Sequence, residues 1–328
     1  MRHHIALLGL PFLCGLLTLS SASLAQPSGG YPQKPIRVII PVPPGGSVDG
    51  EIRIPVLQVV ENTKWTMVIE NQGGGGGAIG TGAVAKAAPD GYTLLGTSGS
   101  FATMPALLKL SFDPIKDFTP LSLIMKRSNI IVVSSTLPFH DLKDYLAYAK
   151  ANPGKLNFGT SGNGGPVHLA GAWLHQWTNT KVTFVHYKGF GGPFLVDLAA
   201  GRLSATIGSM STLGPQIKDG KLRILGISGN TRAKVLPDMP TIAEQGVPGY
   251  NYINWAGVLG PAGMNPEIVK TLSGEFAKAA RTPALIKRLE GLNGEVVGSS
   301  SEEFGQFVRK EIEIWQKLVK DTGIQADE

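Results

Sequence analysis

The sequence predicts an α/β protein made of two doubly wound domains. From Tyr31 onward, short β-rich runs alternate with helical runs, and this pattern is typical of strand–loop–helix units around a parallel sheet. The length of 328 residues suits two domains of ordinary size. Several strands end in loops rich in Gly, Ser and Thr. In doubly wound sheets ligands bind at the carboxyl ends of the strands, so these loops are the first candidates for a site.

The first 25 residues predict a signal peptide. Arg2 precedes an apolar run, and Ser23-Leu-Ala25 places small residues where a signal peptidase cleaves. We expect cleavage after Ala25 and export of a soluble mature chain. A retained membrane anchor is the alternative, which Pro11 and Gly15 inside the run disfavour.

Charge and cysteine content exclude further classes. The only cysteine, Cys14, lies in the leader, so the exported chain is held by its core without disulfides. The net charge of +6 includes Arg2, which leaves +5 after cleavage. These charges form no basic block with stacking aromatics, so we expect no nucleic-acid binding. A weak field that collects small anions and ordinary solubility remain equally open.

The first element sets the pattern for the chain. Pro35–Ile40 reads as a buried strand, Gly45-Gly46-Ser47 as a turn, and 48–61 as the helix that follows. A strand that turns directly into a helix aims several backbone N–H groups at one point, which suits an anion. Such a junction is also common in α/β proteins without any ligand.

The next unit contains a formal dinucleotide motif. A strand over 66–70 leads into five glycines and a helix over 78–88, and Gly75–Gly80 matches G-x-G-x-x-G. Five consecutive glycines satisfy many patterns, and no acidic residue stands at the end of a next strand about 20 residues on. We therefore expect a turned loop and no nicotinamide cofactor.

Two further strands deliver nearly the same polar loop. The strand 92–96 ends in Thr97-Ser98-Gly99-Ser100, and the strand 155–158 ends in Gly159-Thr-Ser-Gly162 before a helix over 166–177. Hydroxyl groups and loop amides at strand ends can donate to a carboxylate.

The rest of the chain continues the alternation. We expect strands at 129–133, 182–185, 203–207 and 224–227, an extended run over 250–259, and a helix over 142–151. Ser300–Glu303 predicts a capping box for a C-terminal helix. The apolar residues that recur along this helix, from Phe304 to Val319, predict core packing.

Catalytic and metal chemistry find little support. No G-x-S-x-G elbow is present, since Gly159-Thr-Ser161-Gly-Asn163 ends in the wrong residue. The histidines 140, 168, 175 and 186 lack the i, i+4 spacing of a zinc helix. We expect no enzyme activity, metal or cofactor. For His168 and Lys188 two roles stay open: contact with an anionic ligand, or a packed histidine and a solvated lysine.

Matched segments in order resemble one known family. They include Tyr31–Arg37, Pro41–Asp49, Ala87–Leu95, Leu236–Glu244 and Trp255–Gly263. Over the whole mature chain the sequence resembles the Bug family, the periplasmic substrate-binding proteins of tripartite tricarboxylate transporters.

The resemblance implies a type II periplasmic-binding-protein-like fold with a cleft between two domains joined by crossing strands near 129–133 and 250–255. After the expected signal peptide over 1–25, it implies a first domain of 26–128 plus 254–328 and a second of 129–253. A monomer in the periplasm would pass a small carboxylate to the membrane components of a transporter. A carboxylate receptor that serves sensing is the alternative, and a secreted serine hydrolase is a remote one.

In this family one ligand carboxylate is held by two strand–turn–helix loops, here 43–49 and 160–165. The candidate ligand-binding residues are Pro43, Pro44, Gly45, Gly46, Ser47, Asp49, Ser98, Thr160, Ser161, Gly162, Asn163, Gly164, Gly165, His168, Lys188, Phe190, Gly208 and Ser209.

Two departures from the family pattern bear on the ligand. Gly208 stands where many relatives have aspartate, so this loop lacks a partner for an ammonium group and a solute without an amine is favoured. Val42-Pro43 replaces Phe-Ala. Phe101, Phe190 and Trp255 offer aromatic surface or pack in the core, so aromatic carboxylates stay open beside aliphatic di- and tricarboxylates.

Overall fold

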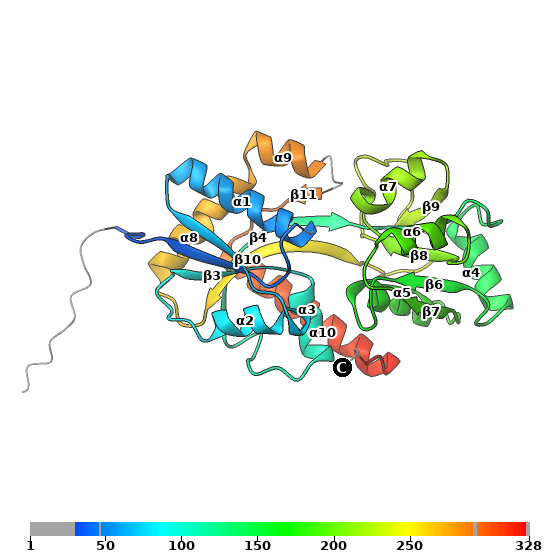
Figure 1. The fold of residues 1–328 in the computed structure, drawn as a ribbon, viewed down its shortest axis with the longest axis horizontal. Coiled ribbons are helices and arrows are strands. Elements are labelled where there is room, and N and C mark those ends of the chain that lie inside the picture. Colours follow the sequence, from blue (N-terminus) through cyan, green and yellow to red (C-terminus); the bar gives the residue numbers. More distant parts are fainter. Residues whose placement is uncertain (1–29, 46, 291–293, 326–328) are drawn as a thin grey trace, which may run out of the picture.

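Two α/β lobes joined by two crossings of the chain form the molecule (Figure 1). The computed structural model describes residues 30–45, 47–290 and 294–325. The expected leader, Cys14, the cleavage site after Ala25 and Gly46 lie outside the described residues. Among the described helices none is both long and apolar enough to cross a membrane.

The first lobe surrounds a six-stranded sheet in the order β11-β4-β10-β3-β1-β2. Its strands are β1 (Ile36–Ile40), β2 (Met67–Asn71), β3 (Thr93–Ser98), β4 (Phe118–Ser128), β10 (Ile253–Pro261) and β11 (Gly294–Val296). Its helices are α1 (Ser47–Thr63), α2 (Ala78–Ala85), α3 (Ser100–Leu107), α8 (Pro266–Ala280), α9 (Pro283–Glu290) and α10 (Ser301–Thr322), with a 3₁₀ turn at Gly75–Gly77.

Helices cover both faces of this sheet (Figure 1). Alternate residues of β1 point to opposite faces, as strand geometry requires: Ile36 and Val38 pack under α1, α8 and α9, whereas Ile39 belongs to the cluster with α2, α3 and α10. A strand buried on both faces reads as a continuous apolar run, which explains Ile36–Ile40.

The second lobe surrounds a five-stranded sheet in the order β7-β6-β8-β5-β9. Its strands are β5 (Ile130–Ser134), β6 (Asn157–Thr160), β7 (Thr183–His186), β8 (Ala205–Gly208) and β9 (Leu222–Ile227). Its helices are α4 (Leu142–Ala151), α5 (Pro166–Trp177), α6 (Gly192–Ala199) and α7 (Met210–Lys218).

Both sheets are mixed, which corrects the expectation of parallel sheets. β1 is parallel to β2 and β3, and β6 is parallel to β7 and β8. β10 runs antiparallel to its neighbours in the first sheet, and β5 does so in the second. The chain enters β5 and β10 from the other lobe, whereas the short edge strand β11, also antiparallel to β4, follows α9 of its own lobe.

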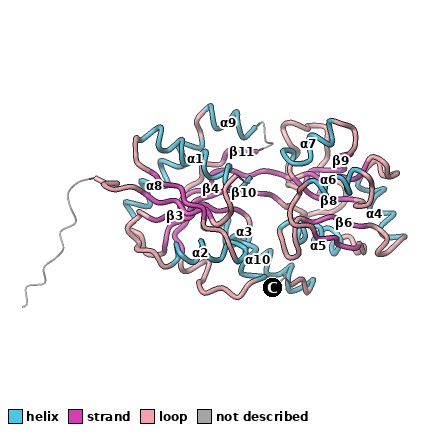
Figure 2. Tube along the Cα trace, viewed as in Figure 1, coloured by secondary structure: helices cyan, strands magenta, loops and turns pink. Residues whose placement is uncertain are grey.

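This reversal fixes how the sheets face each other. β4 leaves the first sheet at the carboxyl edge of its parallel strands, and after Asn129 the chain enters the second sheet as the reversed strand β5. β9 and β10 repeat this in the other direction. The carboxyl edges of both sheets therefore meet at the seam between the lobes, where Figure 2 shows the loops gathered.

The two crossings are hydrogen-bonded to each other. Ser228 accepts a bond from the Asn129 N–H at 2.9 Å through its hydroxyl and donates to the Tyr252 carbonyl at 2.5 Å. Tyr252 returns its N–H to the Ser228 carbonyl at 2.8 Å. Asn254 also reaches the Asn129 side chain at 3.3 Å. The crossings thus form one connected strip.

Candidate ligand-binding site

The loop 43–49 joins β1 to α1 at the seam. Pro43, Pro44 and Gly45 are exposed, and Gly45 has φ 86°, a conformation that glycine adopts without strain. The Gly45 N–H donates to Asp49 Oδ2 at 3.1 Å. This donor therefore closes the turn, and Ser47 opens the helix α1 behind it.

Asp49 is the centre of a network that holds this loop. Its carboxylate, on a residue only 4% exposed, accepts from Arg53 at 2.8 and 3.2 Å and from Asn71 at 2.9 Å. Asn71 also donates to the Val42 carbonyl at 3.0 Å. The hydrogen bond from Arg53 is the main reason that the pKa of Asp49 falls to about 2, against the opposing effect of burial. The structure therefore gives Asp49 a positioning role.

The loop 160–165 joins β6 to α5 in the second lobe. The Thr160 hydroxyl is buried, 2.7 Å from His186 Nδ1 and 3.2 Å from the Gly162 carbonyl. Gly162 and Gly164 have φ of 153° and 66°, which favours glycine at both positions. Ser161 and Asn163 are half-buried, and Gly165 is the N-cap residue of α5.

His168 supports this loop from below. It is buried, its Nδ1 accepts from the Gly164 N–H at 3.0 Å, and its ring packs edge-on against Phe184 and His186. Of the two roles left open for His168, these contacts favour the packed one.

The remaining predicted residues lie at three other strand ends. Lys188 is exposed in the loop after β7, next to Gly189, whose N–H bonds the Ser161 carbonyl at 3.1 Å. Phe190 is half-buried with its ring 4.7 Å from Phe194. Ser209 caps α7 by accepting the Thr212 N–H at 3.2 Å.

Gly208 is closely packed. A Cβ there would lie 2.8 Å from Leu213 Cδ1 and 3.6 Å from the Phe190 ring. The volume that an aspartate would need is therefore filled by Leu213 in this chain.

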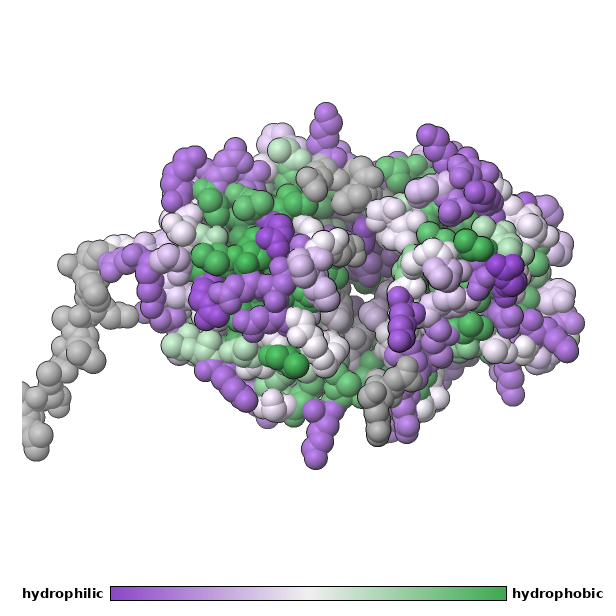
Figure 3. Space-filling model, viewed as in Figure 1, coloured by the Kyte–Doolittle hydropathy of each residue, from purple (hydrophilic) through white to green (hydrophobic). Residues whose placement is uncertain are grey.

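A pocket of about 190 Å³ lies at the seam, next to the start of α1 and the start of α5. Of the described residues that the sequence predicts to bind a ligand, Ser98 alone lines this pocket. Val42 precedes the first loop, Val48 belongs to it, and Pro166 follows the second. The full lining is Val42, Val48, Glu51, Ser98, Gly99, Ser100, Thr103, Pro166, Tyr252, Ile253, Asn254, Glu311 and Trp315. Figure 3 shows the indentation between the lobes from outside.

Two buried carboxylates in this lining escaped the sequence analysis. Glu51 lies 2.6 Å from Arg127, and burial raises the pKa of Glu51 although Arg127 opposes this. Glu311 accepts from the Trp315 indole at 3.4 Å, and burial raises its pKa to about 7. The sequence offers one signal for their burial, an acidic residue within the apolar face of a helix. Glu51 stands beside Ile52 in α1, and Glu311 stands beside Ile312 in α10.

The aromatic candidates divide between core and surface. Phe101 is buried edge-on against Phe118, and Trp255 is buried between Phe304 and Phe307. Core packing is therefore the role of these two. The predicted core stripe of α10 is confirmed, although Trp315 also lines the pocket.

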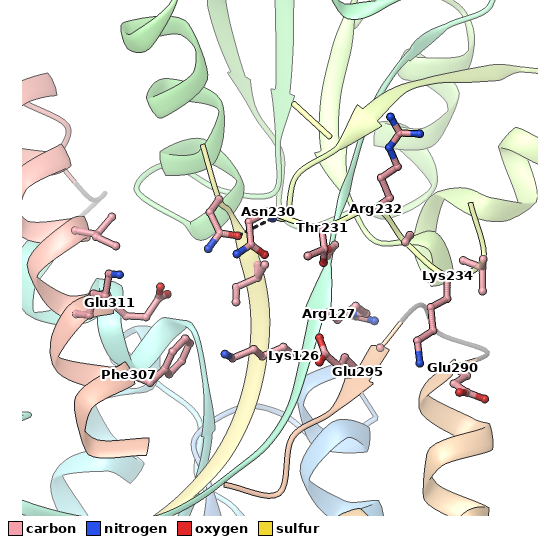
Figure 4. A pocket seen from close by; sticks show the side chains of 18 residues that line it. Lys126, Arg127, Asn230, Thr231, Arg232, Lys234, Glu290, Glu295, Phe307 and Glu311 are labelled. Carbon is pink, nitrogen blue, oxygen red and sulfur yellow. Dashed lines mark hydrogen bonds between the residues drawn. The ribbon is translucent and has the colours of Figure 1, made fainter. Parts of the chain in front are cut away.

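A larger cavity of about 890 Å³ lies elsewhere between the lobes (Figure 4). It is lined by β4, β11, α10 and residues 230–235, and by neither strand–turn–helix loop. We take the smaller pocket as the site because it adjoins both loops at the carboxyl edges.

Within the described residues no group of three or more His, Cys, Asp or Glu could hold a metal ion.

A family model described as "Tripartite tricarboxylate transporter family receptor" matches residues 53–324. The chain belongs to this receptor family. Its relatives include Protein BugT of Bordetella pertussis, 32% identical over 93% of this chain and 95% of that protein. The resemblance to the Bug family is therefore confirmed.

Similar solved structures agree with the fold. Rpa4515 of R. palustris, solved with adipate, is 32% identical with a TM-score of 0.78 and covers 90% of this chain and 99% of its own. MatC of Rhodopseudomonas palustris, solved with malate, is 28% identical with a TM-score of 0.74 and covers 88% and 100%. The predicted two-domain binding-protein fold is thereby confirmed.

Proposed function

We propose that this receptor binds a small organic carboxylate in the pocket between its lobes, in the periplasm, and delivers it to a tripartite tricarboxylate transporter. The observation that carries the proposal is a 190 Å³ pocket flanked by both strand–turn–helix loops. The volume is below that of pockets for drug-sized ligands, about 300–1,000 Å³. It suits a small acid, and two relatives were solved with adipate and malate.

The proposed binding mode places the ligand between two domains. We place the first domain at 26–128 plus 254–328 and the second at 129–253. In support, β4 ends at Ser128, β5 begins at Ile130 in the other sheet, and β10 returns at Ile253. A ligand that touches both domains favours the closed arrangement by its differential affinity.

The packing at Gly208 supports a solute without an amine. Leu213 occupies the space beside it, and the loop 208–212 contains no acidic residue. Aliphatic di- and tricarboxylates and aromatic carboxylates remain the candidate classes. The ring of Trp315, which lines the pocket, supports the aromatic class.

A thermal-shift screen of adipate, malate, citrate, benzoate and phthalate tests the proposal. At 100 times its Kd an acid that binds the folded state should stabilise it by about 2.7 kcal/mol. Because Ser98 lines the pocket, Ser98→Ala should weaken the best acid about tenfold, the loss expected for one hydrogen bond to a charged group.

Ser111→Ala, at an exposed serine outside this pocket, is the matched control and should bind normally. No stabilisation by any acid would disprove the carboxylate receptor. Normal binding by Ser98→Ala would move the site elsewhere. Uptake of the acid by cells that lack this chain would argue against delivery and favour sensing.

A further inference from the structure

Glu311 separates the ligand pocket from the larger cavity. It lines both spaces and is only 7% exposed. In Figure 4 its side chain reaches toward the larger cavity from α10, near Phe307 and Lys126. A carboxyl group in this wall can exchange protons with solvent in the larger cavity while a solute occupies the pocket.

The groups around Glu311 come from four elements. On α10 they are Lys310 and the Trp315 indole, and on β4 they are Lys126 and Arg127. On β10 the Trp255 indole lies within reach of Glu311. The Tyr252 phenol, just before β10, interacts with Glu311 electrostatically. From α1, Glu51 lines the same pocket but is paired with Arg127. The larger cavity adds Arg232, Lys234, Glu290 and Glu295.

Among the described residues of the pocket, Glu51 forms a salt bridge with Arg127, whereas Glu311 forms none. The ammonium group of Lys126 lies instead over the Phe307 ring, 4.7 Å from its centroid. Burial outweighs the two indoles and the two lysines, and the pKa of Glu311 lies near 7. Both protonation states are therefore accessible near neutral pH.

We propose that Glu311 determines which charge state of the site accepts the solute, so that capture of a carboxylate is coupled to uptake of a proton by Glu311. The inference rests on the proposed function. A pocket of about 190 Å³ leaves an anion no position remote from Glu311. An ionised Glu311 repels the anion, whereas the protonated form offers an O–H donor.

The protonation of Glu311 sets the direction in which solute affinity changes with pH. An anion beside Glu311 raises the pKa of this group further in the complex, so the complex holds more protons than the free receptor between pH 6 and 8. Solute affinity should therefore fall as pH rises, by about tenfold from pH 6 to pH 8, equivalent to about 1.4 kcal/mol. The carboxyl groups of adipate and benzoate stay ionised throughout this range.

Titration calorimetry with adipate and benzoate at pH 6, 7 and 8 tests this. Repeating it in buffers of different ionisation enthalpy counts the protons taken up. The wild type should take up a fraction of one proton at pH 7. Glu311→Gln should take up none and should bind with an affinity independent of pH, because glutamine keeps the shape and donors without the charge. Glu313→Gln, exposed on the same helix, should behave as the wild type.

The outcomes separate the two proposals. Binding of an acid with no proton uptake and no pH dependence would overturn the role of Glu311 and leave the carboxylate receptor intact. Affinity that rises with pH would mean that ionised Glu311 accepts a donor from the solute, which also overturns it. If neither acid nor any other of the screen binds, the proposed function fails and this inference fails with it. The proton count needs only the wild type, so a poorly folded variant does not block the test.

Discussion

At the scale of single residues, buried carboxylates organise the seam and serve different purposes. Asp49 is tied by Arg53 and Asn71 into the first loop, and Glu51 is tied by Arg127. Glu311 has indole neighbours and no such guanidinium partner among the described residues. Positively charged partners lower the pKa of a carboxyl group and burial raises it, so the pKa of Asp49 falls whereas burial raises the pKa of Glu51 and of Glu311.

Asp49→Asn should loosen the first loop. We expect a loss of about 1–3 kcal/mol of unfolding free energy at pH 7, measured by urea denaturation, because charge-assisted bonds to Arg53 are lost. The folded pKa of about 2 lies below the ordinary value of 3.8, so this stabilisation is complete above about pH 4 and disappears as the pH falls toward 2.

The difference between wild type and Asp49→Asn should therefore shrink from pH 7 to pH 3. Asp238→Asn, at an exposed aspartate, is the control and should change stability little at either pH. A difference that stays constant down to pH 2.5 would contradict the ionic role of Asp49.

At the scale of elements, junctions between strand and helix decide the shape of the site. At the end of β8, Gly208 brings the strand against Leu213 of α7. Gly208→Ala should destabilise the protein by about 1–3 kcal/mol through overpacking.

The matched test is a double-mutant cycle with Leu213→Ala, which removes the atoms in the way. The combined variant should be more stable than the sum of the two single losses predicts. Strictly additive losses in thermal or urea unfolding would show that α7 moves aside without strain.

Many elements were predictable because their boundary signals are local. The bounds expected for α4 and α5 agree with the structure: Asp141 caps the first by accepting the Asp144 N–H, and Pro166 opens the second. The Ser300–Glu303 capping box is present. The sequence does not predict β4, because Pro120 and Lys126 interrupt its apolar pattern. It does not predict the short helices α6 and α7 either, because α6 has a proline at its start and α7 has one inside it.

The site was predictable only in part. The two Gly-rich loops could be placed at strand ends, since a loop after a strand lies at the carboxyl edge. The inward position of Glu51 and Glu311 depends on tertiary packing of α1 and α10 against the crossing strands. An acid in an apolar helical face indicates burial, but the sequence does not say which cavity the face meets.

At the scale of the molecule, the two hydrogen-bonded crossings connect the lobes. Ser228 links Asn129 and Tyr252 through its hydroxyl. Ser228→Ala should cost about 1–3 kcal/mol, because a buried N–H and a carbonyl lose their partner.

The same variant should also bind solute more weakly, since lobes that move independently pay more entropy on closing. Thermal unfolding and calorimetry with the best acid of the screen measure the two effects. Unchanged affinity with reduced stability would confine Ser228 to folding.

The shortness of the first crossing has a mechanical consequence. β4 and β5 are separated by Asn129 alone, whereas each lobe extends well away from this pivot (Figure 1). A small rotation at such a pivot produces its largest displacement at the outer helices. Under the proposed closure, a membrane partner that spans both lobes would register an occupied receptor by the separation of two distant surfaces, without contact with the solute.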